Sequence, residues 1–235
     1  MAAIIFDVDD TLYDQLTPFQ LAFTMNFPNT EIPVEQLFKY SRIYSDEVFE
    51  LSENGSISKL DMQIYRIRKA LAHYDIQITD EQGAKFQANY QYYQSQIQLD
   101  PAMQEALDLC VAHHFPIGII TNGPAEHQKK KIKQLGLNRW VPTEQMLVSG
   151  EWGVAKPDIR IFELAEAVMD LKKETTYYVG DSYENDVVGA KNAGWKAVWI
   201  NRRNHAESSE IKADILIDQE TTIKNFLLSL VLTGA

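Results

Sequence analysis

Short apolar runs recur along the chain, and most are continuous rather than alternating. Continuous runs are typical of strands that are buried on both faces of a parallel sheet. Five clear runs are Ala3–Phe6, Ile117–Thr121, Met146–Val148, Tyr177–Val179 and Ala197–Ile200, and Ala213–Ile217 is a weaker sixth. Amphipathic stretches of helical length lie between most of them, at Pro101–His114, Ala125–Leu135, Asp158–Met169 and Tyr183–Ala193. This alternation predicts an α/β fold with a doubly wound, Rossmann-like parallel sheet.

The interval between the first two strands carries helical patterns and no strand pattern. These patterns cover Pro18–Phe27, Val34–Ser52, Lys59–Tyr74 and Thr79–Ile97. We therefore expect residues 14–99 to form an all-helical cap domain, inserted into an α/β core domain that residues 1–13 and 100–235 form. Pro101 suits the point of return, because proline is tolerated in the first turn of a helix.

Composition and charge narrow the class of partner. With 45% apolar and 23% charged residues, the 235-residue chain is globular in composition. The net charge is −11 and the isoelectric point is near 4.9, which argues against binding to nucleic acid or to an anionic membrane. A small phosphorylated substrate stays possible, because one local site can oppose the charge of the whole surface.

The single cysteine, Cys110, excludes an internal disulfide and a cysteine-based zinc site. It lies in the apolar pattern Ala106–Val111, where we expect a buried and inert thiol. The first residues lack the basic region of a signal peptide, and no window approaches the ~18 apolar residues of a membrane span. We expect a soluble cytoplasmic protein, either a monomer or a homodimer.

Polar residues follow four of the predicted strands. In an open parallel sheet, ligands bind beyond the carboxyl ends of the strands, so these residues are expected to share one crevice. They are Asp7 and Asp9 after the first strand, Thr121 and Asn122 at the second, Lys156 after the third, and Asp181 and Asp186 after the fourth.

Such a set suits phosphoryl transfer. Asp7, Asp9 and Asp181 would form an all-oxygen site of the kind that Mg²⁺ prefers. Thr121 and Lys156 offer a hydroxyl and a positive charge to phosphate oxygens, and backbone N–H groups near Asn122 would add to them. Phosphoryl transfer depends mainly on positioning and charge neutralisation, and a carboxylate can also act as the nucleophile.

Each of these motifs alone has an ordinary structural explanation. An aspartate after a strand is often a helix cap or a turn residue, and a lysine before proline is usually solvated. Four such motifs in order, each at a strand end, favour a site instead. By the same standard, Lys129–Lys131 with Lys133 is expected to be a solvated helix face, and Arg202-Arg203 to lie in a surface loop.

The motifs resemble those of the haloacid dehalogenase-like (HAD) hydrolase superfamily over the whole chain. The matching residues are Asp7-x-Asp9-x-Thr11, Thr121, Lys156 and Gly180-Asp181-x4-Asp186. The helical interval after the first motif resembles the subfamily with a helical cap.

The resemblance implies a role for each motif residue. Asp7 would be the nucleophile and a Mg²⁺ ligand. Asp9 would protonate the leaving alcohol and then activate water, while its carbonyl binds the metal. Asp181 would be the third protein ligand, and Asp186 would support the metal or the motif lysine. That lysine and the motif threonine would hold the transferring phosphoryl group.

The resemblance also limits the reaction and the substrate. Dehalogenases of this superfamily lack the second acidic residue of the first motif, so Asp9 favours a phosphatase. Three segments resemble the pyrimidine 5′-nucleotidases of the family, namely Asp9–Asp14, Glu53–Ser58 and Gly153–Pro157. We therefore expect a Mg²⁺-dependent phosphomonoester hydrolase that acts, through an aspartyl-phosphate, on a small metabolite such as a nucleoside 5′-monophosphate.

Two kinds of alternative stay open. Within the superfamily, a sugar-phosphate phosphatase, a phosphoglycolate phosphatase or a phosphomutase would use the same residues. In a different class, a non-enzymatic phospho-acceptor or regulatory binding protein also combines an acidic cluster, a hydroxyl and a lysine on a parallel sheet. Such receiver domains carry the acceptor aspartate after a later strand, which favours an enzyme here.

Overall fold

The sheet contains six parallel strands. The structure, a computed structural model, describes residues 2–218 and 221–234. The strand order is β3-β2-β1-β4-β5-β6, and every neighbouring pair is parallel. The strands are β1 (Ala3–Phe6), β2 (Ile117–Thr121), β3 (Met146–Val148), β4 (Thr176–Gly180), β5 (Lys196–Ile200) and β6 (Ile215–Ile217). The predicted α/β class with a doubly wound parallel sheet is confirmed.

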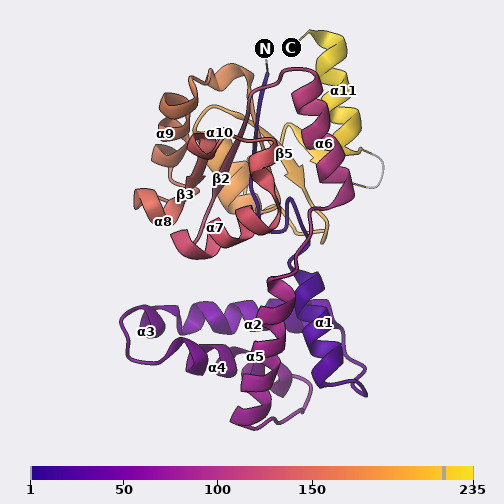
Figure 1. The fold of residues 1–235 in the computed structure, drawn as a ribbon, viewed down its shortest axis with the longest axis vertical. Helices are drawn as coiled ribbons and strands as arrows, with labels where there is room; N and C mark the ends of the chain where they lie inside the picture. Colours follow the sequence, from indigo (N-terminus) through magenta and orange to yellow (C-terminus); the bar gives the residue numbers. More distant parts are fainter. Residues whose placement is uncertain (1, 219–220, 235) are drawn as a thin grey trace. The chain divides into compact units, whose positions relative to one another are not determined.

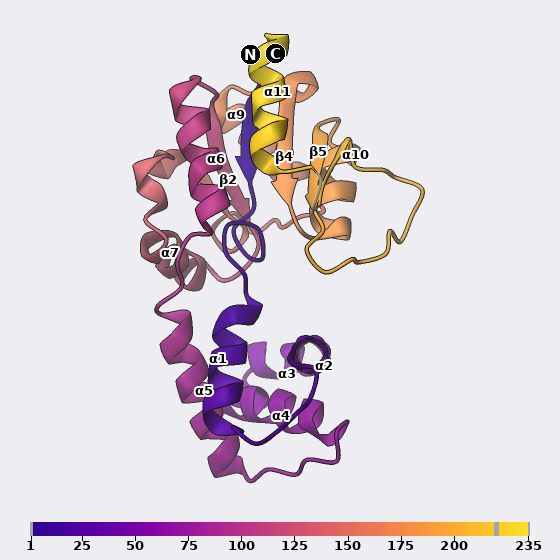
Figure 2. The ribbon, with the colours of Figure 1, turned by 90° about the vertical axis from the view of Figure 1, so that its right-hand side faces the viewer.

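Helices cover both faces of this sheet. They are α6 (Pro101–Ala112), α7 (Ala125–Gln134), α8 (Ser149–Trp152), α9 (Ile159–Met169), α10 (Gly189–Asn192) and α11 (Ile223–Thr233), with short 3-10 turns at Leu137–Arg139, Thr143–Gln145 and Lys173–Thr175. Successive residues of a strand point to opposite faces. On β4, Tyr177 contacts Phe226 of α11, whereas Tyr178 contacts Phe162 of α9. Helix α11 therefore covers one face and α9 the other, and α6 lies beside α11 (Figures 1 and 2).

The predicted helix Tyr183–Ala193 is instead two segments. The chain first forms a π-helical segment, η4 (Tyr183–Val188), and then the short helix α10. Ser182 caps the first segment by accepting a hydrogen bond from the Asn185 N–H. The Asp186 carboxylate turns back to accept from the Ser182 N–H at 2.9 Å. The irregular start of the helix thus directs Asp186 toward the end of β4.

The helical interval forms a second compact unit, Gln15–Ile97 (Figure 1). The residues up to Asp14 and from Gln98 onward form the first unit, here called the core unit. The helices of the second unit are α1 (Leu16–Asn26), α2 (Val34–Glu47), α3 (Phe49–Glu53), α4 (Lys59–Ala72) and α5 (Asp80–Gln94). The expected cap domain, residues 14–99, begins one residue before this unit and ends two residues after it.

Aromatic rings hold the second unit together. Phe19 of α1 makes edge contacts with Phe86 and Tyr90 of α5, at 5.3 Å and 5.6 Å between ring centroids. Ser58 and Thr79 begin α4 and α5 with capping boxes, in which side chain and backbone satisfy each other's free N–H groups. The predicted long helix Val34–Ser52 is wrong in one respect, because the chain interrupts it at Val48.

Cys110 lies fully buried in α6, as predicted, and burial raises the pKa of its thiol to about 12. Within the described ranges, no helix is both long enough and apolar enough to cross a membrane.

Candidate active site

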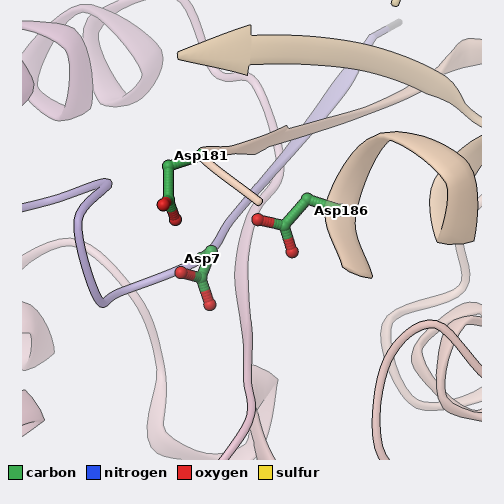
Figure 3. Close-up of side chains that lie close together, drawn as sticks. All are labelled: Asp7, Asp181 and Asp186. Atoms are coloured by element: carbon green, nitrogen blue, oxygen red, sulfur yellow. The ribbon is translucent and has the colours of Figure 1, made fainter. Parts of the chain in front are cut away.

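Three carboxylates meet at the carboxyl end of the central strands. Asp7, Asp181 and Asp186 each contribute an oxygen atom, and these oxygens lie within 4.8 Å of one another (Figure 3). Asp7 follows β1 and Asp181 follows β4. Because β1 and β4 are paired, and because the Asp7 N–H donates to the Val179 carbonyl at 2.9 Å, the two residues leave the sheet side by side.

Gly180 makes room for the third carboxylate. A β-carbon at this position would overlap the carboxylate of Asp186, so a larger residue would force Asp186 away. This close approach explains why a glycine precedes Asp181 in the motif, since glycine is used where another group must come near the backbone.

Lys156 is the cation of this cluster. Its Nζ donates to Asp7 Oδ1 at 2.8 Å, to Asp186 Oδ1 at 2.7 Å and to the Tyr178 hydroxyl at 2.6 Å. Only 5% of the residue is exposed, so Lys156 is not solvated as a lysine before proline usually is. Asn122 fixes the lysine backbone, accepting from its N–H at 2.9 Å and donating to its carbonyl at 2.8 Å. The Asn122 side chain therefore positions the Lys156 loop.

Negative charge exceeds positive charge at this point. The pKa of Asp7 is raised to about 7: burial is the largest cause, Lys156 opposes it, and Asp186 and Asp9 add to it. Burial, together with Asp186 and Asp7, also raises the pKa of Asp181 well above its usual range. Burial alone would lower the pKa of Lys156, but Asp186 and Asp7 hold it well above its ordinary value. One lysine cannot neutralise three clustered carboxylates, two of them buried, so the cluster favours an additional cation.

Asp9 lies outside this group of carboxylates, which corrects the expectation that its side chain joins Asp7 and Asp181. Its Oδ1 and Oδ2 each lie 2.6 Å from Lys131 Nζ. Burial opposes the charge of Asp9, but Lys131 and the hydrogen bond from Gln128 lower its pKa to about 2. Its carbonyl remains only a predicted metal ligand.

Lys131 was therefore wrongly assigned to a solvated helix face. It is 9% exposed, whereas Lys129, Lys130 and Lys133 are exposed as predicted. The sequence held a signal for this difference. Lys131 and Gln128 share the spacing of the buried residues Ile132 and Leu135, so all four lie on one face of α7.

Two threonines of the motifs carry buried hydroxyls. Thr121 ends β2 and Thr11 follows Asp9, and both are completely buried. Among the residues that the structure describes, neither hydroxyl has a hydrogen-bond partner. Buried hydroxyls are normally satisfied, so these are places where a ligand oxygen would fit.

The Arg202-Arg203 pair is also more than a surface loop. Arg203 forms ion pairs with Asp10 at 3.1 Å and with Asp14 at 2.5 Å. Arg202 pairs with Asp100 at 2.9 Å. The loop after β5 thus stabilises the segment that follows β1 and the segment that leads into α6.

A family model of haloacid dehalogenase-like hydrolases matches residues 1–194. The chain belongs to this family. It is 27% identical to a glyceraldehyde 3-phosphate phosphatase of Methanothermobacter thermautotrophicus, over 97% of this chain and all of that one. It is 28% identical to the pyrimidine 5′-nucleotidase YjjG of Escherichia coli, over 88% of each chain. The crystal structure of the HAD-hydrolase YfnB of Bacillus subtilis has the same fold, with a TM-score of 0.69, 22% identity and 97% and 98% of the two chains covered.

Proposed function

We propose that this HAD hydrolase is a Mg²⁺-dependent phosphatase that forms an aspartyl-phosphate on Asp7. The observation that carries the proposal is the position of Asp7, which lies among the clustered carboxylates and contacts Lys156 at 2.8 Å. A nucleophilic carboxylate needs a neighbouring positive charge when an anionic phosphate approaches. The relatives that are named phosphatases and nucleotidases support the same reaction.

The donor set fits a magnesium ion. Asp7, Asp181 and Asp186 supply only carboxylate oxygens, which are the ligands that Mg²⁺ prefers. Their crowding, expressed in the raised pKa values of Asp7 and Asp181, is what a bound divalent cation would relieve. When bound, Mg²⁺ would supply charge stabilisation to the transferring phosphoryl group.

The side chains of the site would act as nucleophile, as general acid and base, and as phosphate ligands. An oxygen of Asp7 attacks phosphorus, and the bond from phosphorus to the leaving oxygen breaks as the new bond forms. Asp9 is ionised in this structure, because its pKa is about 2, so it first takes up the proton that a bound phosphomonoester monoanion carries. It then gives this proton to the leaving alcohol and regains one from the water that hydrolyses the aspartyl-phosphate. Lys156 and the free hydroxyl of Thr121 bind phosphoryl oxygens.

Two substrate classes are supported by specific relatives. The similarity to YjjG favours a nucleoside 5′-monophosphate, in agreement with the three segments identified in the sequence. The similarity to several archaeal glyceraldehyde 3-phosphate phosphatases favours a small sugar phosphate. The nucleoside monophosphate is our first candidate and the triose phosphate our second.

The experiment measures phosphate release from p-nitrophenyl phosphate, then from pyrimidine nucleotides, glyceraldehyde 3-phosphate and phosphoglycolate. We expect many turnovers with Mg²⁺, no activity with EDTA, and loss of turnover in Asp7→Asn with the fold retained. Asp46→Asn, an exposed aspartate of α2, is the matched control and should keep wild-type activity.

Two outcomes would contradict the proposal. Normal activity of Asp7→Asn would exclude Asp7 as the nucleophile. A stable phosphoprotein that forms once per chain, with no further phosphate release, would support the non-enzymatic phospho-acceptor instead.

A further inference from the structure

Asp9 has an unusually complete set of hydrogen-bond donors. Oδ1 accepts from Lys131 Nζ at 2.6 Å and from the Tyr13 hydroxyl at 2.5 Å. Oδ2 accepts from Lys131 Nζ at 2.6 Å and from Gln128 Nε2 at 2.8 Å. A carboxylate offers about four acceptor positions, so every position of Asp9 is occupied. The side chain is therefore held in one orientation.

Helix α7 provides the ionic donor and one of the neutral donors. Lys131 and Gln128 are three residues apart, and each is almost completely buried. Burying a charged lysine is costly, and an apolar replacement of a buried ion pair is often equally stable. A contribution to stability is therefore a weak explanation for a lysine at this position. Holding the Asp9 carboxylate in place is a direct explanation.

Gln128 also connects Asp9 to the loop after β2. Its Nε2 donates to the Asn122 carbonyl at 2.6 Å as well as to Asp9. Gly123 permits this, because a β-carbon there would lie 2.7 Å from Gln128 Nε2. Since the Asn122 side chain holds the backbone of Lys156, one hydrogen-bonded frame joins Asp9 to the loop of the catalytic lysine.

We infer that Lys131 and Gln128 are positioning residues for Asp9 in the phosphatase reaction, an inference that rests on the proposed function. They set where the Asp9 carboxylate stands relative to Asp7 and to the leaving oxygen. Asp9 must take up a proton before it can act as an acid, so one acceptor position has to be vacated, and a neutral donor is displaced at lower cost than the charged lysine. Lys131 keeps the carboxylate in place during that exchange.

The leaving group provides the test. Asp9 assists departure by protonation, so an alkoxide needs this help far more than the stable nitrophenolate does. We compare wild type with Lys131→Met on p-nitrophenyl phosphate and on uridine 5′-monophosphate. If uridine 5′-monophosphate is not turned over, the best alkyl phosphate of the substrate panel replaces it. Misplacing a general acid should lower kcat for the alkyl phosphate roughly 10- to 100-fold, with a smaller loss for p-nitrophenyl phosphate and little change in KM. Lys130→Met, an exposed neighbour, should be unchanged.

A double-mutant cycle separates positioning from a general loss of structure. If Lys131 acts through Asp9, adding Lys131→Met to Asp9→Asn causes no further loss of kcat. Circular dichroism checks each variant for folding, and Gln128→Met provides the same comparison if Lys131→Met does not fold. Equal losses on both substrates, or additive losses in the cycle, would overturn the inference while the proposed function stands. A wild-type protein without phosphatase activity would overturn both.

Discussion

Replacing Lys156 with methionine tests how the carboxylate cluster is neutralised. The lysine is 5% exposed and contacts Asp7, Asp186 and Tyr178 at 2.8, 2.7 and 2.6 Å. Methionine has a similar volume, so the substitution removes the charge and the three donors while leaving little cavity. Two buried carboxylates then lose their cation.

Removing one partner of a buried ion pair destabilises a protein by about 3–5 kcal/mol, because the remaining charge is left buried and unpaired. We expect the free energy of unfolding of the core unit to fall by this amount without metal. For a chain of this size, that corresponds to a melting temperature lower by roughly 6–20 °C. Added Mg²⁺ should restore more stability to this variant than to wild type.

Urea unfolding in EDTA, followed by tryptophan fluorescence, measures the effect. All four tryptophans lie in the core unit, so the signal reports on the part of the chain that contains the cluster. Lys130→Met should change stability by no more than about 0.5 kcal/mol, as exposed substitutions usually do. A loss of less than about 1 kcal/mol for Lys156→Met would refute the view that this lysine neutralises Asp7 and Asp186.

Three further predictions concern the same unit. In EDTA, Asp181→Asn should raise the free energy of unfolding by about 1 kcal/mol in urea, because it removes a charge that Asp186 and Asp7 repel. The same variant should lose the rise in melting temperature that Mg²⁺ gives wild type. An unchanged rise would exclude Asp181 as a ligand. Tyr178→Phe should cost about 1–2 kcal/mol, since its hydroxyl accepts from Lys156 and donates to the Ile120 carbonyl, and a neutral result would show that neither hydrogen bond contributes. Cys110 should not react with a disulfide reagent at pH 8 until urea unfolds the chain, because its pKa of about 12 leaves the buried thiol protonated. Rapid labelling of the folded protein would contradict the burial of this thiol.

The strands were predictable because burial on both faces leaves a strong local pattern. The expected β1, β2 and β3 match the structure residue for residue, and β4 and β5 extend by one or two residues. Helix α11 was not predicted, although its buried residues Ile223, Phe226, Leu227 and Leu230 have helical spacing. The helix Tyr183–Ala193 was predicted as regular, because periodicity does not report the hydrogen bond from the Ser182 N–H to the Asp186 carboxylate that reshapes its first turn.

Much of the candidate site was also accessible from the chain. Parallel strands end at one edge of a sheet, so Asp7, Asp181 and Lys156 could be expected together from their places after the strands. The structure places these residues in contact or within a few ångströms of one another. Their roles in catalysis remain predictions that the kinetic experiments address.

The sequence by itself determined the sheet, the helical interval and the identity of the clustered residues, because each depends on patterns within a few turns of chain. Only the tertiary structure decided which charges are paired. Lys131 meets Asp9 across 122 residues, and Arg203 meets Asp10 across 193. Neither pairing leaves a local trace beyond the position of a residue on a helix face or in a loop. Burial makes these pairings necessary, because a charge that is removed from water costs free energy unless the fold brings an opposite charge into contact with it.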